Sequence, residues 1–133
     1  MVALLGKCEA MKERRSSGYQ KSAFKVKEAD VLKAVEIWLT IKKIPHWRIN
    51  SGALKTDRGR LVRFGAPGMS DFYAIGRDGR SIWIECKRPQ GGVVSATQKI
   101  FLDSINRHGG IGIVVNSTES LELQLKEAGV IQD

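Results

Sequence analysis

The chain has 133 residues, with 42% hydrophobic and 27% charged residues, which suits one compact globular domain with a single core. No apolar run approaches the roughly 20 residues that a membrane-spanning helix needs, and the apolar start is too short for a signal peptide. We therefore expect an intracellular protein without a membrane partner. Two cysteines and two histidines argue against a disulfide framework and a four-ligand zinc site.

The formal net charge of +8 is concentrated near the N-terminus, where residues 1–27 hold seven lysines or arginines and two glutamates. A polyanion is the expected partner of such a segment, and a merely solvated basic arm is the alternative. Residues 1–22 show no clean hydrophobic period. We expect them to form a basic extension that is flexible or orders on a partner, followed by one domain over residues 23–133.

The first predicted element is an amphipathic helix from about Val26 to Lys43. Its apolar residues recur at helical spacing, and the Ile44-Pro45 pair ends the pattern. Glu28 lies on the apolar stripe and Glu36 at its edge, so Glu28 is the acid better aimed at a sheet. A favourable charge near the helix N-terminus is the alternative role for Glu28.

Short strands are expected next, at residues 46–50 and 60–64, and turn residues between them predict a hairpin with a long loop. After the break at residues 65–68, strands at 71–75 and 81–87 predict a second hairpin around Arg77-Asp78-Gly79.

A helix should begin at the capping box of Ser95 and Gln98 and end at Gly109-Gly110. A buried strand at residues 111–115 and a last helix ending near Ala128 follow. The predicted order is α-β-β-β-β-α-β-α. Because a helix connects the strands at 81–87 and 111–115, they should run parallel, which gives an α/β fold with a mixed sheet flanked by helices.

Three chemically active side chains lie at the open ends of the second predicted hairpin. Glu85 and Lys87 share one face of their strand, because strand residues alternate between faces. The face of Asp71 depends on the turn. A two-residue turn would place Asp71 opposite Cys86, whereas a three-residue loop over residues 77–79, with a left-handed glycine, would place it opposite Glu85. We predict the second register.

Two converging carboxylates suit Mg²⁺ or Mn²⁺, which take oxygen ligands together with waters and a substrate phosphate. The backbone carbonyl of Cys86 is a further candidate ligand between the two functional side chains. Such a metal would activate water, and Lys87 could orient that water or stabilise the charge of the transition state. A simple salt bridge between Glu85 and Lys87 is the alternative. The pattern is typical of a metal-dependent phosphodiesterase.

The chain resembles a known family in a series of motifs. These are Gly65-Ala66-Pro67-Gly68-Met69-Ser70-Asp71, Ile84-Glu85-Cys86-Lys87, Ser95-Ala96-Thr97-Gln98 and Gly109-Gly110. Over roughly residues 26–116 they look like the VRR-Nuc branch of the PD-(D/E)xK nucleases, and Trp47-Arg48-Ile49-Asn50-Ser51-Gly52 looks like its first hairpin. The resemblance implies a restriction-endonuclease-like αβββαβ core and an endodeoxyribonuclease that uses Mg²⁺ or Mn²⁺.

The resemblance also implies roles for individual residues. Asp71 and Glu85 would bind the metal, Lys87 would be the catalytic lysine, Gln98 a supporting residue and Glu28 a helix-borne acid. Ser70 replaces the proline of the superfamily's name, as is usual for this branch. Stand-alone members resemble junction-resolving nucleases, which implies branched DNA such as Holliday junctions, a homodimer, and a place in the cytoplasm, the nucleoid or a phage-infected host.

Basic residues flank the predicted site and are candidates for phosphate contacts: Arg48, Lys55, Arg58, Arg60, Arg63 and Arg88. Two other classes of function remain open. A non-catalytic nucleic-acid-binding module would keep the fold and the basic surface, and an assembly protein would use the strand-end acids in salt bridges. A saturable metal site and metal-dependent cleavage would separate both from a nuclease.

Overall fold

The computed structural model describes residues 24–50 and 52–133, so the predicted extension at residues 1–22 lies outside the described residues. The elements are α2 (Glu28–Ile41), β1 (His46–Arg48), β2 (Gly52–Lys55), β3 (Leu61–Phe64), β4 (Phe72–Ile75), β5 (Ser81–Cys86), α3 (Ala96–Arg107), β6 (Ile111–Val115) and α4 (Thr118–Glu127). Within the described ranges, no helix has the length and apolar character needed to cross a membrane.

Four strands form the main sheet in the order β1-β4-β5-β6. β4 pairs antiparallel with both β1 and β5, whereas β6 pairs parallel with β5 after the crossover through α3. The predicted α/β class, the mixed sheet and the parallel crossover are therefore confirmed.

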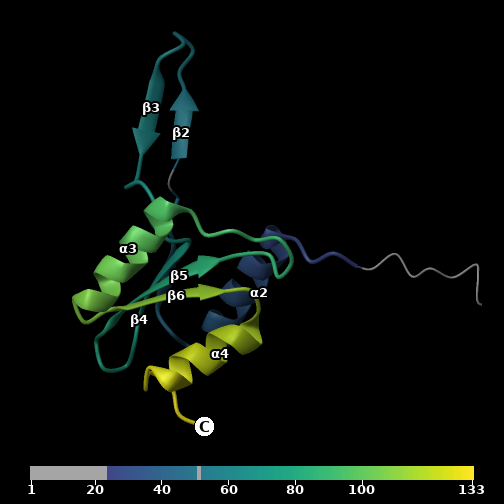
Figure 1. Ribbon diagram of the computed structural model, residues 1–133, viewed down its shortest axis with the longest axis vertical. Coiled ribbons are helices and arrows are strands. Elements are labelled where there is room, and N and C mark those ends of the chain that lie inside the picture. The colour runs from purple at the N-terminus through teal and green to yellow at the C-terminus, as the bar shows by residue number, and fades with distance from the viewer. Residues whose placement is uncertain (1–23, 51) are drawn as a thin grey trace, which may run out of the picture.

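Helices cover both faces of this sheet, with α3 on one side and α2 and α4 on the other (Figure 1). The side chains of Ile82, Ile84 and Cys86 belong to the core cluster that also holds the buried residues of α2 and α4, as their alternation predicts. On the other face, Trp83 packs edge-on against Phe101 of α3, with ring centroids 5.2 Å apart. β5 is thus buried on both faces, which leaves its end as the place where polar side chains meet.

The turn between β4 and β5 has the predicted form. Gly76 donates to the carbonyl of Arg80 at 2.9 Å, which leaves a three-residue loop, and Gly79 takes the left-handed conformation with φ of 84°. Phe72 consequently pairs with Ile84, so that Asp71 precedes the ladder opposite Glu85. The predicted register is confirmed.

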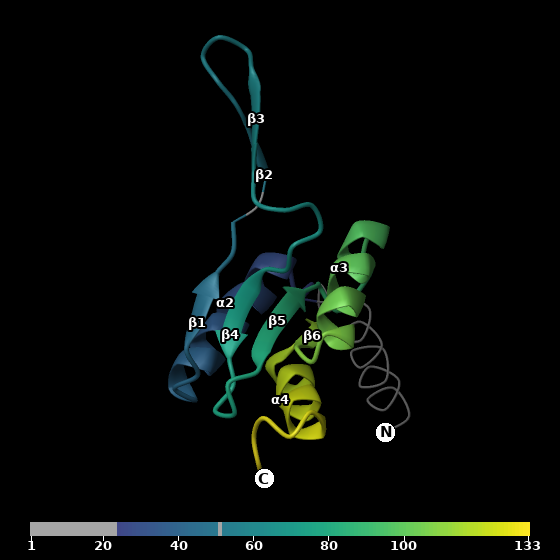
Figure 2. The ribbon, with the colours of Figure 1, turned by 90° about the vertical axis from the view of Figure 1, so that its left-hand side faces the viewer.

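The prediction for the first hairpin was wrong. β1 pairs with β4 instead of β3, and the partner of β3 is β2, a strand that we did not predict. Glycine and alanine have low strand propensity, so residues 52–55 gave little signal of a strand. β2 and β3 form a separate two-stranded sheet, which we call the ribbon, that projects from the domain (Figure 2). The other predicted bounds are confirmed to within two residues.

Candidate active site

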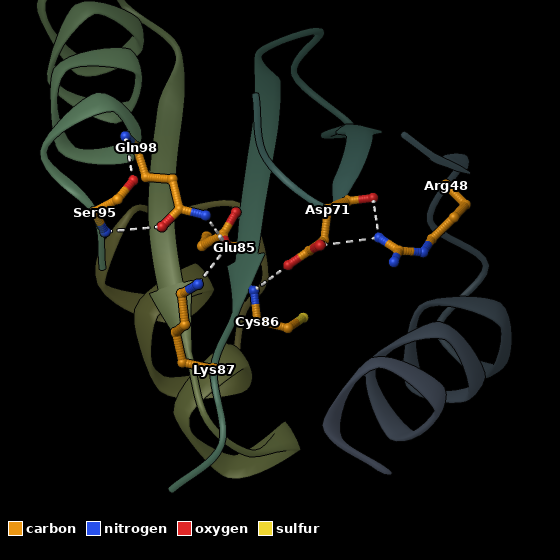
Figure 3. A network of polar contacts seen from close by, with 7 residues as sticks. All are labelled: Arg48, Asp71, Glu85, Cys86, Lys87, Ser95 and Gln98. Atoms are coloured by element: carbon orange, nitrogen blue, oxygen red, sulfur yellow. Dashed lines mark hydrogen bonds and ion pairs between the residues drawn. The ribbon is translucent and has the colours of Figure 1, made fainter. Parts of the chain in front are cut away.

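The candidate site lies where β4 begins, β5 ends and α3 starts (Figure 3). Asp71 directly precedes β4, Glu85 is near the end of β5 and Lys87 directly follows it, while Gln98 is in the first turn of α3. Three consecutive segments of the chain are brought together because β4 and β5 are neighbours in the sheet and α3 packs on the face that carries Glu85.

Glu85 is buried, with only 2% of the residue exposed. Its Oε1 accepts a hydrogen bond from Gln98 Nε2 at 2.7 Å and an ion pair from Lys87 Nζ at 3.0 Å. The 3% exposure of the Glu85 side chain and 14% of the Lys87 side chain make this a largely desolvated pair. The predicted grouping of the acid, the lysine and the glutamine is therefore present.

The capping box of α3 sets the position of Gln98. Ser95 N–H donates to Gln98 Oε1 at 2.9 Å, and Gln98 N–H donates to Ser95 Oγ at 3.2 Å. With its Oε1 held by the backbone, the amide group directs Nε2 toward Glu85 (Figure 3). One side chain thus caps the helix and contacts the site, so the residue that the capping pattern placed in the first turn is also the one to which the resemblance assigned a supporting role.

Two donors hold the carboxylate of Asp71. Its Oδ2 accepts the N–H of Cys86 at 2.8 Å, and its Oδ1 pairs with Arg48 Nη1 at 3.1 Å. Arg48 Nη1 also donates to the carbonyl oxygen of Asp71 at 2.8 Å, and its guanidinium lies over the ring of Phe72. Our sequence reasoning assigned Arg48 only to phosphate contact and missed this role, because that depends on the pairing of β1 with β4.

The electrostatic environment raises the pKa of Glu85 above its ordinary value. Burial is the main cause, followed by the negative charge of Asp71, and the hydrogen bond and charge of Lys87 oppose the shift. A carboxylate with this environment binds a proton more readily than an exposed one. A bound divalent cation would offset the electrostatic cost of holding two negative charges close together, because it would neutralise both acids.

Cys86 contributes its backbone to the site, while its side chain is in the core with 0% exposure. Burial raises the pKa of its thiol, so the thiol is not activated as a nucleophile. Lys87 N–H donates to Val115 of β6, so the carbonyl of Cys86, in the same trans peptide unit, points to the opposite side, toward Asp71. Pairing with β4 ends at Ile84, which leaves this carbonyl outside that ladder.

The structure places Glu28 at the first residue of α2, where it is exposed. Its charge contributes to the raised pKa of Glu85, so it lies within electrostatic range of the site. The described residues nevertheless hold no group of three His, Cys, Asp or Glu side chains arranged for a metal ion. The ligands on offer are two carboxylates and a carbonyl, a set that fits Mg²⁺, which retains several waters.

Arg88 is exposed and directly follows Lys87, and it lines an open groove of about 780 Å³. The groove runs past Glu28, and Lys25 and Lys27 also line it. The remaining basic candidates, Lys55, Arg58, Arg60 and Arg63, all lie exposed on the ribbon or its tip. A hollow of about 810 Å³ at the other end of the sheet contains none of the candidate site residues.

Comparisons with known proteins add no relative. The chain matches no family model, and searches of curated proteins and of solved structures also find no match.

Proposed function

We propose that the protein is a metal-dependent endonuclease that hydrolyses phosphodiester bonds in DNA. The observation that carries this proposal is the position of Asp71 opposite Glu85 at the ends of adjacent strands, with Lys87 and Gln98 bound to Glu85. A buried glutamate with a raised pKa is costly to the fold, and such groups cluster at functional sites.

The order of elements supports assignment to the VRR-Nuc branch of the PD-(D/E)xK nucleases. Without the ribbon, the chain runs α2, β1, β4, β5, α3 and β6, which is the αβββαβ order of that core. The ribbon is an insertion between the first and second strands. Asp71 lies at the start of the second strand of this order, and Glu85 and Lys87 lie at the end of the third, which fits the motif of the family.

Asp71, Glu85 and the carbonyl of Cys86 would hold Mg²⁺ or Mn²⁺. When bound, the cation would lower the pKa of a coordinated water and neutralise charge on the phosphate. The chain orients its own groups for this task. Cys86 N–H and Arg48 fix the carboxylate of Asp71, and Gln98 fixes that of Glu85. Lys87 holds a positive charge beside Glu85, where it can donate a hydrogen bond to water or to a phosphate oxygen.

A non-catalytic DNA-binding module is the second candidate, and the exposed basic residues on the ribbon favour it equally. The presence of Asp71, Glu85 and Lys87 together argues for catalysis, since acidic side chains do not favour binding to a polyanion.

The experiment compares wild-type protein with Asp71→Asn and Lys87→Met on a labelled DNA duplex and a labelled four-way junction, with Mg²⁺ or Mn²⁺. Wild-type protein should cut at least one substrate, and both variants should lose cleavage while they still bind DNA. Binding without cleavage by the wild type on either substrate would support the module instead. Equal cleavage by Asp71→Asn would remove the proposed site.

A further inference from the structure

The ribbon stands apart from the main sheet and projects along the long axis of the molecule in both views (Figures 1 and 2). Its strands pair from Gly52–Phe64 to Lys55–Leu61, and the Thr56 N–H bond to Arg60 closes the tip. All residues from 52 to 64 are exposed. The four residue steps from 52 to 56 give the extended part a length of about 13 Å at about 3.3 Å per residue.

The two faces of the ribbon differ in chemistry. Directly paired residues share a face, so Lys55 and Arg63 lie on one face together with Ala53 and Leu61, whereas Leu54, Val62 and Phe64 lie on the other, which carries no charge. Arg58 and Arg60 add charge at the tip, and Asp57 is the one acid between residues 52 and 64. The ribbon therefore carries a strong positive charge on one face and at its end.

Both strands of the ribbon are connected directly to the candidate site. The chain enters the ribbon just after Arg48, which pairs with Asp71, and Ile49 N–H donates to the Asp71 carbonyl at 2.8 Å. The returning strand passes a hollow of about 310 Å³ lined by both strands and residues 65–68, and then leads to Asp71. A molecule held at the base of the ribbon would therefore lie close to Asp71.

We propose that the ribbon is a DNA-binding arm, with Lys55 and Arg63 on phosphates of a duplex beside the scissile bond and Arg58 and Arg60 farther along it. The identity of the polyanion rests on the proposed function. The major groove of B-DNA, about 12 Å wide, admits a two-stranded ribbon. The basic face complements phosphates, whereas two copies of the chain joined through their ribbons would bring like charges together.

The test measures binding of a fluorescein-labelled DNA duplex by anisotropy across a salt series, with EDTA present so that no cleavage occurs. The full chain is compared with Lys55→Gln/Arg63→Gln and with a matched control, Lys33→Gln/Arg77→Gln. The control removes two exposed charges from α2 and the β4–β5 turn. The ribbon variant should bind about tenfold more weakly, with a log–log salt slope reduced by about 1.8, while the control keeps a slope closer to that of the wild type.

Equal affinity and slope in the two double variants would overturn the proposal. The apolar face could instead be an interface between two copies of the chain. This would be shown if Val62→Thr lost DNA binding and changed a dimer to a monomer in sedimentation, while the Lys55/Arg63 variant bound DNA normally. That result would also overturn it. Ribbon-dependent binding by a wild-type protein that never cuts DNA would leave the arm in place and reject only the nuclease. Cleavage with an unchanged KM in the Lys55/Arg63 variant would support the nuclease and reject the DNA-binding arm.

Discussion

Replacement of Lys87 by methionine should unmask the cost of burying Glu85. The variant keeps most of the length of the side chain but removes the ammonium group that lies 3.0 Å from Glu85 Oε1. Loss of one partner from a buried ion pair typically costs about 3–5 kcal/mol. Gln98 still donates to Glu85, and Glu85 can take up a proton, so we expect a loss of about 2–3 kcal/mol in the free energy of unfolding at pH 7 without metal.

The loss should depend on pH with a defined sign. At a pH below the ordinary value of 4.5, Glu85 is protonated in the folded and unfolded states, so removal of Lys87 leaves no unpaired charge. The difference between variant and wild type should therefore be small in acid and grow as the pH rises through the raised pKa of Glu85.

Urea unfolding in EDTA between pH 4 and pH 8 measures this difference. Lys126→Met is the matched control, because the ion pairs of Lys126 with Glu122 and Asp133 are at the surface, and its loss of stability should be much smaller than that of Lys87→Met. The double variant Glu85→Gln/Lys87→Met should recover most of the stability that Lys87→Met alone loses. A loss at pH 7 no larger than that of the control, or one that does not vary with pH, would refute the reasoning.

Three further changes test neighbouring parts of the site. Glu85→Gln alone should stabilise the metal-free protein at pH 7 and lose this advantage below pH 4.5, because Glu85 binds its proton more tightly in the folded wild type than in the unfolded chain. Urea unfolding at a series of pH values measures the stability difference between variant and wild type, and a difference that shrinks as the pH rises would contradict this. Gly68→Ala should destabilise the protein more than Gly59→Ala, for which we expect only the cost of about 1–2 kcal/mol of a left-handed alanine. The reason is that a Cβ at residue 68 would meet Thr97 O at 2.5 Å, whereas Gly59 faces open space. Equal melting temperatures of the two variants would contradict this. Arg48→Met should cost less than about 1 kcal/mol of stability, because the pair is partly exposed. It should weaken Mn²⁺ binding in calorimetry, because Arg48 fixes the carboxylate of Asp71; tighter binding would show that Arg48 instead competes with the metal for that acid.

The sequence predicted the part of the site that depends on local rules. Alternation along one strand placed Glu85 beside Lys87, the turn chemistry around Gly79 set the register of Asp71, and the capping box placed Gln98 at the start of α3. Each of these follows from residues close in the chain, where backbone geometry allows few alternatives.

Contacts between distant segments were not predictable in the same way. The pairing of β1 with β4 joins residues more than twenty positions apart, and without it Arg48 gave no sign of its bond to Asp71. β2 begins with Gly52 and Ala53, which have little intrinsic preference for a strand, so its partner β3 was assigned to β1. Because β1 pairs with β4, β3 pairs with β2 in the ribbon and Arg48 reaches Asp71.

Calorimetric titration of Mn²⁺ into the wild-type protein, Asp71→Asn and Glu85→Gln tests the proposed metal site most directly. The wild type should show one saturable site, with an affinity that rises with pH because the metal competes with the proton of Glu85. Both variants should stay folded and lose that site. Absence of binding to the wild type, or equal binding by either variant, would contradict a cation held between Asp71 and Glu85.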